Sequence, residues 1–242
     1  MARSMDAFSP LQAEASPGGR YLRFDGVGAV VTPAAPERSL LNGAGYATTD
    51  ALAVGLPRLA EVYEDAGVRA WSVWVNPGDE DAGKLLADAG LKLDSEPRAM
   101  AAPLDEMELG EGGAGIEWTR GAEGSIVGRV NALAYGYDEH GFVEAFGGYD
   151  PELTYLGLLE GEPAATVMTT HHSGDCGVWW VATLPEGRGR GLSSGLMRQA
   201  LLDARDAGCE TTSLQATAMG YPIYARIGYR DLGEFQMWEH RR

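Results

Sequence analysis

The chain has 242 residues, of which 45% are hydrophobic and 22% are charged, a composition typical of a globular protein with one large domain or two small ones. Its net charge of −16 argues against a nucleic-acid-binding surface, which needs a basic face. The two cysteines form no disulfide framework or metal-ligand pattern, and no apolar run approaches the roughly 18 residues of a membrane span, so we expect a cytoplasmic protein without metal or membrane partner.

The first half of the chain predicts a small α/β unit, because apolar residues recur at helical spacing between short β-branched and aromatic runs. Glycines follow both expected helices, at Gly67 and Gly90, where they are typical of helix ends. The expected elements are a loose arm at 1–18, strands at 21–24 and 29–32, a helix at 50–66, a strand at 70–75, a helix at 81–89 and a strand reaching Met100.

Residues 109–115, LGEGGAG, contain four glycines and no apolar period, which predicts a linker between domains at 19–108 and 116–242. An aromatic-rich mobile segment is expected at 135–149. The other elements expected after the linker are strands at 116–118, 155–159, 164–170, 178–184 and 211–216, helices at 125–135, from Leu192 and at 223–227, and a last strand containing Met237.

A glycine-rich basic turn joins the strand at 178–184 to the helix that starts at Leu192. The strand is apolar and aromatic, Pro185 ends it, and Gly187-Arg188-Gly189-Arg190-Gly191 follows. Glycines let a backbone approach a ligand closely, a helix N-terminus carries partial positive charge, and arginines add full charges. The turn therefore predicts a site for a pyrophosphate or a similar anion.

The order Arg188-Gly189-Arg190-Gly191-Leu192-Ser193 resembles the (Gln/Arg)-x-x-Gly-x-(Gly/Ala) signature of the GCN5-related N-acetyltransferases (GNAT). In that family the turn holds the pyrophosphate of acetyl-CoA, so the resemblance implies acetyl-CoA as cosubstrate. Ser193 departs from the signature, but it is small and keeps its amide. The resemblance also covers the element order over 116–242 and is only architectural over 20–108. It implies an α/β (α+β) fold of two tandem GNAT-like domains, each a mixed, mostly antiparallel sheet flanked by helices.

The two halves share a pattern that predicts a tandem repeat. An Asp-Ala-Gly at 65–67 and another at 206–208 each close a helix, and a strand, a turn, a short helix and a glycine exit follow in both halves. The first half has no arginine-glycine turn, and Leu86 stands where the second half has Tyr224. We therefore expect the first domain to be a degenerate copy. The alternative is that any two α/β segments would align this well.

The resemblance also implies roles for residues around the turn. Main-chain amides at Val181, Ala182 and Thr183 would bind the pantetheine and the thioester oxygen. Tyr224 matches the family's tyrosine that donates to the departing sulfur, and the alternative is a core aromatic at the contact between helix and sheet. The full set of expected cofactor-binding residues is Val181, Ala182, Thr183, Arg188, Gly189, Arg190, Gly191, Leu192, Ser193 and Ser194.

The activity implied is acetyl transfer from acetyl-CoA to a primary amine by direct attack on the thioester. The alternative is a non-catalytic acyl-CoA-binding or interaction module on the same fold. The acceptor could be a small molecule or a peptide amine, and the chain a monomer or a homodimer. By position His171, His172, Glu144 and Asp175 are all candidates for the general base, and His140 for the acceptor cleft.

Overall fold

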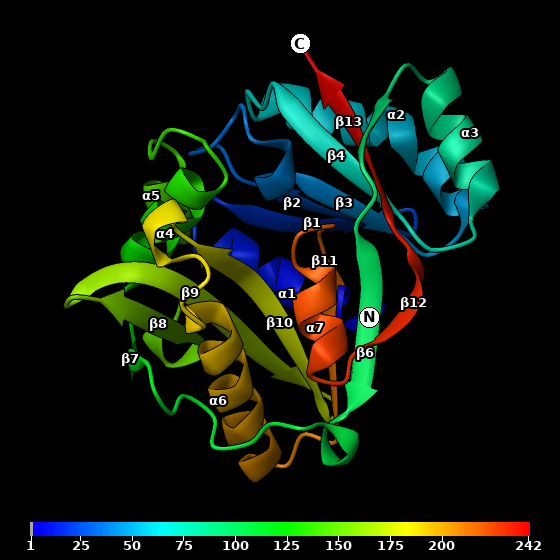
Figure 1. Cartoon of the computed structure of the whole chain (residues 1–242). Helices are drawn as coiled ribbons and strands as arrows, with labels where there is room; N and C mark the ends of the chain where they lie inside the picture. The colour runs from blue at the N-terminus through cyan, green and yellow to red at the C-terminus, as the bar shows by residue number, and fades with distance from the viewer. Residues whose placement is uncertain (1) are drawn as a thin grey trace.

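The computed structural model describes residues 2–242, which form two mixed β-sheets with helices packed on them (Figure 1). The first sheet has six strands in the order β1-β2-β3-β4-β13-β5, and the second has seven in the order β12-β6-β11-β10-β9-β8-β7. Within the described residues each sheet has a single parallel pair, β3 with β4 and β10 with β11. The predicted fold class, with two mixed and mostly antiparallel sheets, is confirmed.

The first sheet is covered on one face by two helices whose apolar residues pack on its strands. Leu52, Leu59 and Tyr63 of the longer helix are fully buried there, and Leu86 of the shorter one joins them. The elements are β1 (Arg20–Phe24), β2 (Val27–Val31), η1 (Ser39–Leu41), β3 (Gly43–Tyr46), α2 (Thr49–Asp65), β4 (Ala70–Val75), α3 (Glu80–Asp88), β5 (Lys92–Ser95) and β13 (Gln236–Arg241).

The second sheet is covered on both faces. α6 packs on one face, whereas α4 and α5 pack on the other. Its elements are β6 (Arg98–Pro103), η2 (Leu104–Glu106), β7 (Glu117–Arg120), α4 (Gly124–Ala134), α5 (Phe142–Phe146), η3 (Pro151–Leu153), β8 (Thr154–Leu159), β9 (Glu162–His172), β10 (Asp175–Thr183), η4 (Pro185–Gly187), α6 (Leu192–Asp206), β11 (Thr211–Ala216), α7 (Tyr221–Arg226) and β12 (Arg230–Glu234).

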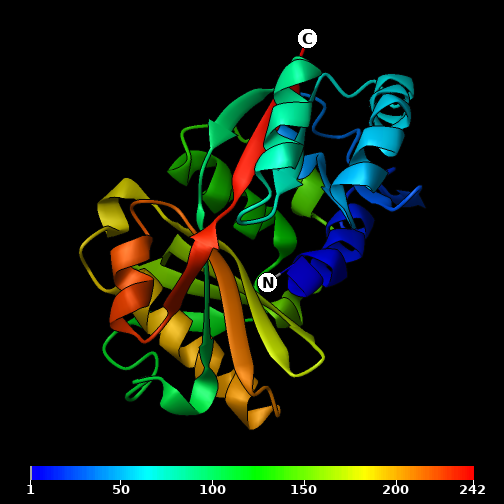
Figure 2. The ribbon, with the colours of Figure 1, turned by 90° about the vertical axis from the view of Figure 1, so that its right-hand side faces the viewer.

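The C-terminal strands of the two halves are exchanged between the sheets. β6 lies between β11 and β12 in the second sheet, whereas β13 lies between β4 and β5 in the first. The β5–β6 segment pairs antiparallel with the β12–β13 segment, and the Phe235 amide donates to the Pro97 carbonyl at the crossing (2.9 Å). Figure 2 shows the red C-terminal strands running from one sheet to the other.

This exchange corrects the predicted domain limits. The expected linker at 109–115 does not divide the sheets, because each sheet takes one strand from the other half of the chain. The segment is also packed rather than free: Leu109 is only 3% exposed and belongs to the core beneath α6.

The expected loose arm at 1–18 is wrong for most of its length, because α1 (Ala2–Glu14) is a helix that packs on both sheets. Phe8 is 5% exposed, and its ring stacks on Trp179 of β10 with the ring centroids 4.2 Å apart. The Ser4 hydroxyl donates to Asp175 (2.6 Å). The polar composition of this segment hid one apolar anchor, and only the tertiary contact reveals it.

No described helix is long and apolar enough to cross a membrane.

Candidate active site

The glycine-rich turn leads into a helix whose N-terminus is open. Gly189 and Gly191 have φ angles of +74° and +79°, and the space where their Cβ atoms would lie is empty. Gly191 is the N-cap of α6, no side chain caps the helix, and its first turn carries no acidic residue. The first N–H groups of α6 are therefore available to an anion, which the helix dipole also favours.

Both arginines of the turn are exposed and only partly engaged. Arg188 donates from Nε to the Thr183 carbonyl and from Nη2 to the Ala134 carbonyl, at 3.3 Å each, and Arg190 donates from Nε to a carbonyl of the same turn (3.1 Å). A guanidinium has five donors, so most of them remain for a phosphate. The other predicted residues of the turn are Leu192, which is buried, and Ser193 and Ser194, which are half-buried on the first turn of α6.

β10 parts from its neighbour just before this turn. Its parallel pairing with β11 ends at Val178, so residues 181–183 continue without β11 beside them. The register with β9 also shifts, because a bulge places an extra residue at Trp180, whose φ is +50°. A bulge next to a splayed strand re-aims main-chain groups away from the ladder. The main chain at 181–183, where the resemblance implies cosubstrate-binding amides, is therefore not paired with β11.

A buried amide that the sequence analysis missed holds this bulge in place. Asn131 of α4 is fully buried, and its Nδ2 donates to the Thr166 hydroxyl (3.0 Å) and to the Trp180 carbonyl (3.4 Å). The Thr166 hydroxyl donates to the same carbonyl (2.9 Å). A lone asparagine on the apolar face of a predicted helix was the available signal, because a buried amide needs polar partners.

Tyr224 of α7 lies close to the splayed strand. It is 7% exposed, and its ring makes an edge contact with Tyr229, with the centroids 6.0 Å apart. Burial raises the pKa of the Tyr224 phenol well above its ordinary value, and the neighbouring Tyr135 adds to the effect. The phenol therefore stays protonated at neutral pH and can donate a hydrogen bond.

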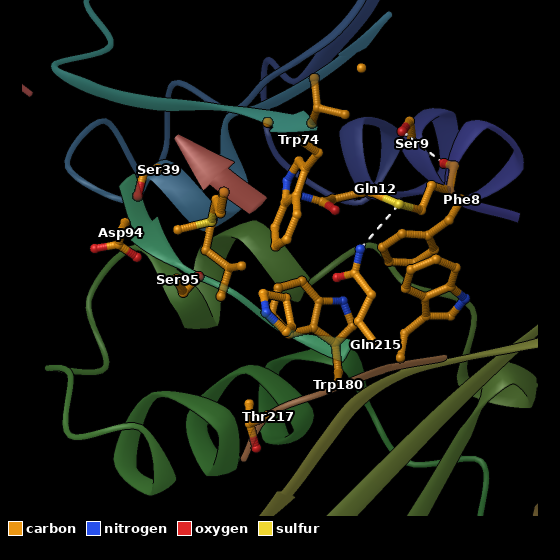
Figure 3. A pocket seen from close by; sticks show the side chains of 18 of the residues that line it. Phe8, Ser9, Gln12, Ser39, Trp74, Asp94, Ser95, Trp180, Gln215 and Thr217 are labelled. Carbon is orange, nitrogen blue, oxygen red and sulfur yellow. Dashed lines mark hydrogen bonds between the residues drawn. The ribbon is translucent and has the colours of Figure 1, made fainter. Parts of the chain in front are cut away.

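Tyr224 and residues 178–181 line one wall of a cavity of about 570 Å³ between the two sheets, which we call the central cavity. The opposite wall is the face of the first sheet that α2 and α3 leave open, and α1 closes one side. Figure 3 shows Trp74 and Trp180 pointing into it from opposite walls, with Phe8, Ser9 and Gln12 at one end and Asp94 and Ser95 at the other.

Missing side chains make room for this cavity. Gly28 on β2 and Gly43 and Gly45 on the neighbouring β3 line it. A Cβ on Gly28 would collide with the Tyr21 hydroxyl, and one on Gly43 would press on the Trp74 indole. On β13 the alternate residues Met237, Glu239 and Arg241 also line the cavity, because alternate residues of a strand face one side.

The four candidate bases lie elsewhere. His171, His172 and Asp175 flank the β9–β10 hairpin turn, at the opposite end of β10 from residues 181–183, and Asp175 accepts hydrogen bonds from three hydroxyl groups. Glu144 is exposed on α5. None of the four lines the central cavity, and neither does His140, whereas Tyr135 and Tyr137 of the same segment do. Sequence proximity misled here because the hairpin carries these groups away from the turn.

The predicted turn residues, 188–194, are likewise absent from the lining of the central cavity. The structure therefore separates an anion-binding end, at the start of α6, from a cavity end that contains Tyr224. The splay after Val178 lies between the two, and its residues 179–181 line the cavity.

The family model described as "Acetyltransferase (GNAT) domain" matches residues 176–231, which include the bulged strand, the turn, α6 and Tyr224. A comparison with curated protein sequences gives no match.

Solved structures share the fold across nearly the whole chain. A GCN5-related N-acetyltransferase from Kribbella flavida superposes with a TM-score of 0.67 at 19% identity, covering 98% of this chain and 95% of that one. One from Sphaerobacter thermophilus gives 0.62 at 18% identity, with 89% and 76% covered. A tandem GNAT protein from the clavulanic acid biosynthesis pathway gives 0.60 at 11% identity, with 99% and 95% covered.

At these identities the likeness to solved structures concerns the fold, and the family model adds the motif-bearing segment of the sequence. The chain therefore shares its fold with GCN5-related N-acetyltransferases, and its segment 176–231, which contains the open N-terminus of α6 and the splayed strand, matches the GNAT domain model.

Proposed function

We propose that this protein is an acetyl-CoA-dependent N-acetyltransferase that transfers an acetyl group to a primary amine. The observation that carries the proposal is the sequence of features along one strand: an uncapped helix N-terminus with two arginines follows β10, whose splayed residues share a cavity with Tyr224. An anion-binding turn alone would suit many ligands. A turn joined to a buried tyrosine donor across a splayed strand suits a thioester whose long arm leads to a pyrophosphate.

The residues of the turn fit such a ligand. The N–H groups at Gly189 to Ser194 would receive the pyrophosphate, with Arg188 and Arg190 supplying charge. Empty space at the two positive-φ glycines leaves the backbone accessible. Val181, Ala182 and Thr183 would supply main-chain groups to the pantetheine and the thioester oxygen, because β11 does not pair with them.

The chain's own groups can then assist a direct transfer. Acetyl-CoA supplies an activated acyl carbon when it is bound. The free amine attacks that carbon, the bond from carbon to sulfur breaks, and the thiolate receives a proton from the Tyr224 phenol or a hydrogen bond to it. The ammonium formed in the attack loses its extra proton to water, and the phenol recovers its own from solvent. N–H donors at the bulge would stabilise the oxyanion.

The test is a calorimetric titration of acetyl-CoA and of desacetyl-CoA into the whole protein, followed by an amine-acetylation assay. We expect one site per chain and, in Arg188→Ala, a dissociation constant about tenfold higher, since a charged hydrogen bond is worth about 1.5–3 kcal/mol. Arg205→Ala, at the other end of α6, is the matched control. No binding, or unchanged binding in Arg188→Ala, would refute the assigned turn. Binding without turnover of any amine would favour the non-catalytic module.

A further inference from the structure

The central cavity carries an excess of negative charge that the proposed reaction does not use. Among its described lining residues are four carboxylates, those of Asp6, Asp94, Glu96 and Glu239, and a single guanidinium, that of Arg241. Arg241 pairs with Glu239 through Nη2 (2.6 Å). The remaining carboxylates have no arginine or lysine within ion-pair distance among residues 4–242, whose side chains the structure describes.

Among these carboxylates, Asp94 has the most distinctive position in the fold. It lies where the register between β5 and β13 shifts, so it is the extra residue opposite Met237 and Trp238. Asp94 lies at the exposed rim of the cavity, and its carboxylate makes no hydrogen bond to the described side chains or main chain. Partial burial and the charge of Glu239 raise its pKa, and the charge of Arg241 offsets only part of that rise. A cation beside it would relieve both the desolvation and the repulsion.

The walls around these carboxylates are aromatic. Trp74 comes from the first sheet and Trp180 from the second, on opposite sides of the cavity (Figure 3). Tyr21 and Tyr137 add further rings. Such walls bind a flat or apolar body by burial, and their faces attract cations. A volume of about 570 Å³ is in the range of small-molecule sites.

The carboxylates at Asp94 and Glu239 lie on the other wall of the cavity from the groups proposed for the chemistry. The nitrogen that is acetylated must reach the thioester carbon, beside the groups proposed for the chemistry. The groups proposed for the chemistry, Tyr224 and residues 181–183, come from the second sheet, whereas Asp94 and Glu239 come from the first. The negative wall therefore suits a second positive group on the acceptor, away from the nitrogen that is acetylated.

We infer that the acceptor is a small-molecule amine that carries a second cationic group on a flat, apolar body, with that second group bound at Asp94 and Glu239. The inference rests on the proposed function only in calling this ligand the acceptor. Binding of such an amine can be measured without acetyl-CoA, so the inference about the amine and the proposed function can fail separately.

Three amines of the same shape test it: p-xylylenediamine, p-methylbenzylamine and p-(aminomethyl)benzoate, which place an ammonium, a methyl or a carboxylate at the same position. Each is titrated into the protein by calorimetry. We expect the diamine to bind about tenfold more tightly than the methyl compound, and the carboxylate to bind most weakly, because like charges across a binding site are strongly disfavoured.

Asp94→Asn should raise the dissociation constant of the diamine about tenfold and leave that of p-methylbenzylamine within about twofold. Asp88→Asn, on the exposed surface of α3, is the control and should change neither. Equal affinity for the three amines, no binding of any of them, or an unaltered diamine affinity in Asp94→Asn would overturn the inference. Acetylation of the bound diamine then tests the proposed function, and its failure would leave the binding result intact.

Discussion

In each sheet, the first strand of the parallel pair is followed by a helix: β3 by α2 in the first sheet, and β10 by α6 in the second. The N-termini of these two helices differ. α6 starts at Gly191 and has no side-chain cap. α2 starts after Thr48, whose hydroxyl accepts the Ala51 amide (3.1 Å). The hydroxyl of Thr49 then donates to the carboxylate of Asp79 (3.0 Å), which places a negative group at this helix end. One N-terminus is left for a ligand, and the other is closed by the protein itself.

The charged side chains at the N-termini of α2 and α6 have opposite sign. Partial burial alone would raise the pKa of Asp79, but hydrogen bonds from Tyr46, the Ala82 amide and Thr49 outweigh it and hold that pKa below its ordinary value. Asp79 is therefore ionised at neutral pH and, together with Asp50 in the first turn of α2, would repel a pyrophosphate. The start of α6 has arginines instead.

The strands that precede α2 and α6 also differ, one being regular and the other bulged. β3 pairs with β2 in continuous register, whereas β10 is bulged against β9 at Trp180. Leu86 is fully buried in α3, whereas Tyr224 lines the central cavity. The same element order therefore does not by itself make a site: the first sheet keeps the shape and contributes a wall of the cavity, and the second carries the groups that we propose for the chemistry.

The largest effect is expected at the tyrosine that distinguishes the halves. Tyr224→Phe should lower turnover by roughly 10²–10³-fold, the scale of a lost general acid, while leaving the dissociation constant of acetyl-CoA unchanged. Tyr229→Phe is the matched control: it removes the hydroxyl that pairs with Thr212 (2.7 Å) and should reduce stability by about 1 kcal/mol with turnover kept. Full activity in Tyr224→Phe would make this residue a core aromatic like its neighbour.

A second substitution makes the start of α6 resemble that of α2. Ser193→Asp should weaken acetyl-CoA binding by about a hundredfold, because it puts a negative charge at the pyrophosphate position, yet the same charge should stabilise the helix by about 0.3–1 kcal/mol. Calorimetry and thermal unfolding measure the two effects. Ser193→Ala, which adds no charge, should bind normally. Loss of both binding and stability would indicate misfolding rather than repulsion.

The smallest effect is expected from opening the closed helix end. Thr48→Ala removes the cap and should cost about 1 kcal/mol of unfolding free energy, whereas Thr48→Ser should retain it. Acetyl-CoA stoichiometry should stay at one per chain in both variants, because Asp79 and Asp50 remain. A second binding site in Thr48→Ala would show that the cap alone had silenced the first half.

Local sequence determined much of this protein. Apolar periodicity and helix-ending glycines located α2, β4, α3 and α6 within a residue or two, and the glycine-arginine turn located the open helix end, because these features depend on neighbouring residues and backbone conformation. The fold class was implied by the resemblance of the turn and of the element order to the GNAT family.

Only the tertiary structure decided which strands share a sheet and which side chains share a cavity. The exchange of β6 and β13, the docking of α1 through Phe8, and the meeting of Trp74 and Asp94 with Trp180 all join segments far apart in the chain. Strand pairing is set by long-range packing and not by propensity, so no local pattern could show it. The histidines of the β9–β10 hairpin lie far from the glycine-arginine turn because the length of β10 separates them.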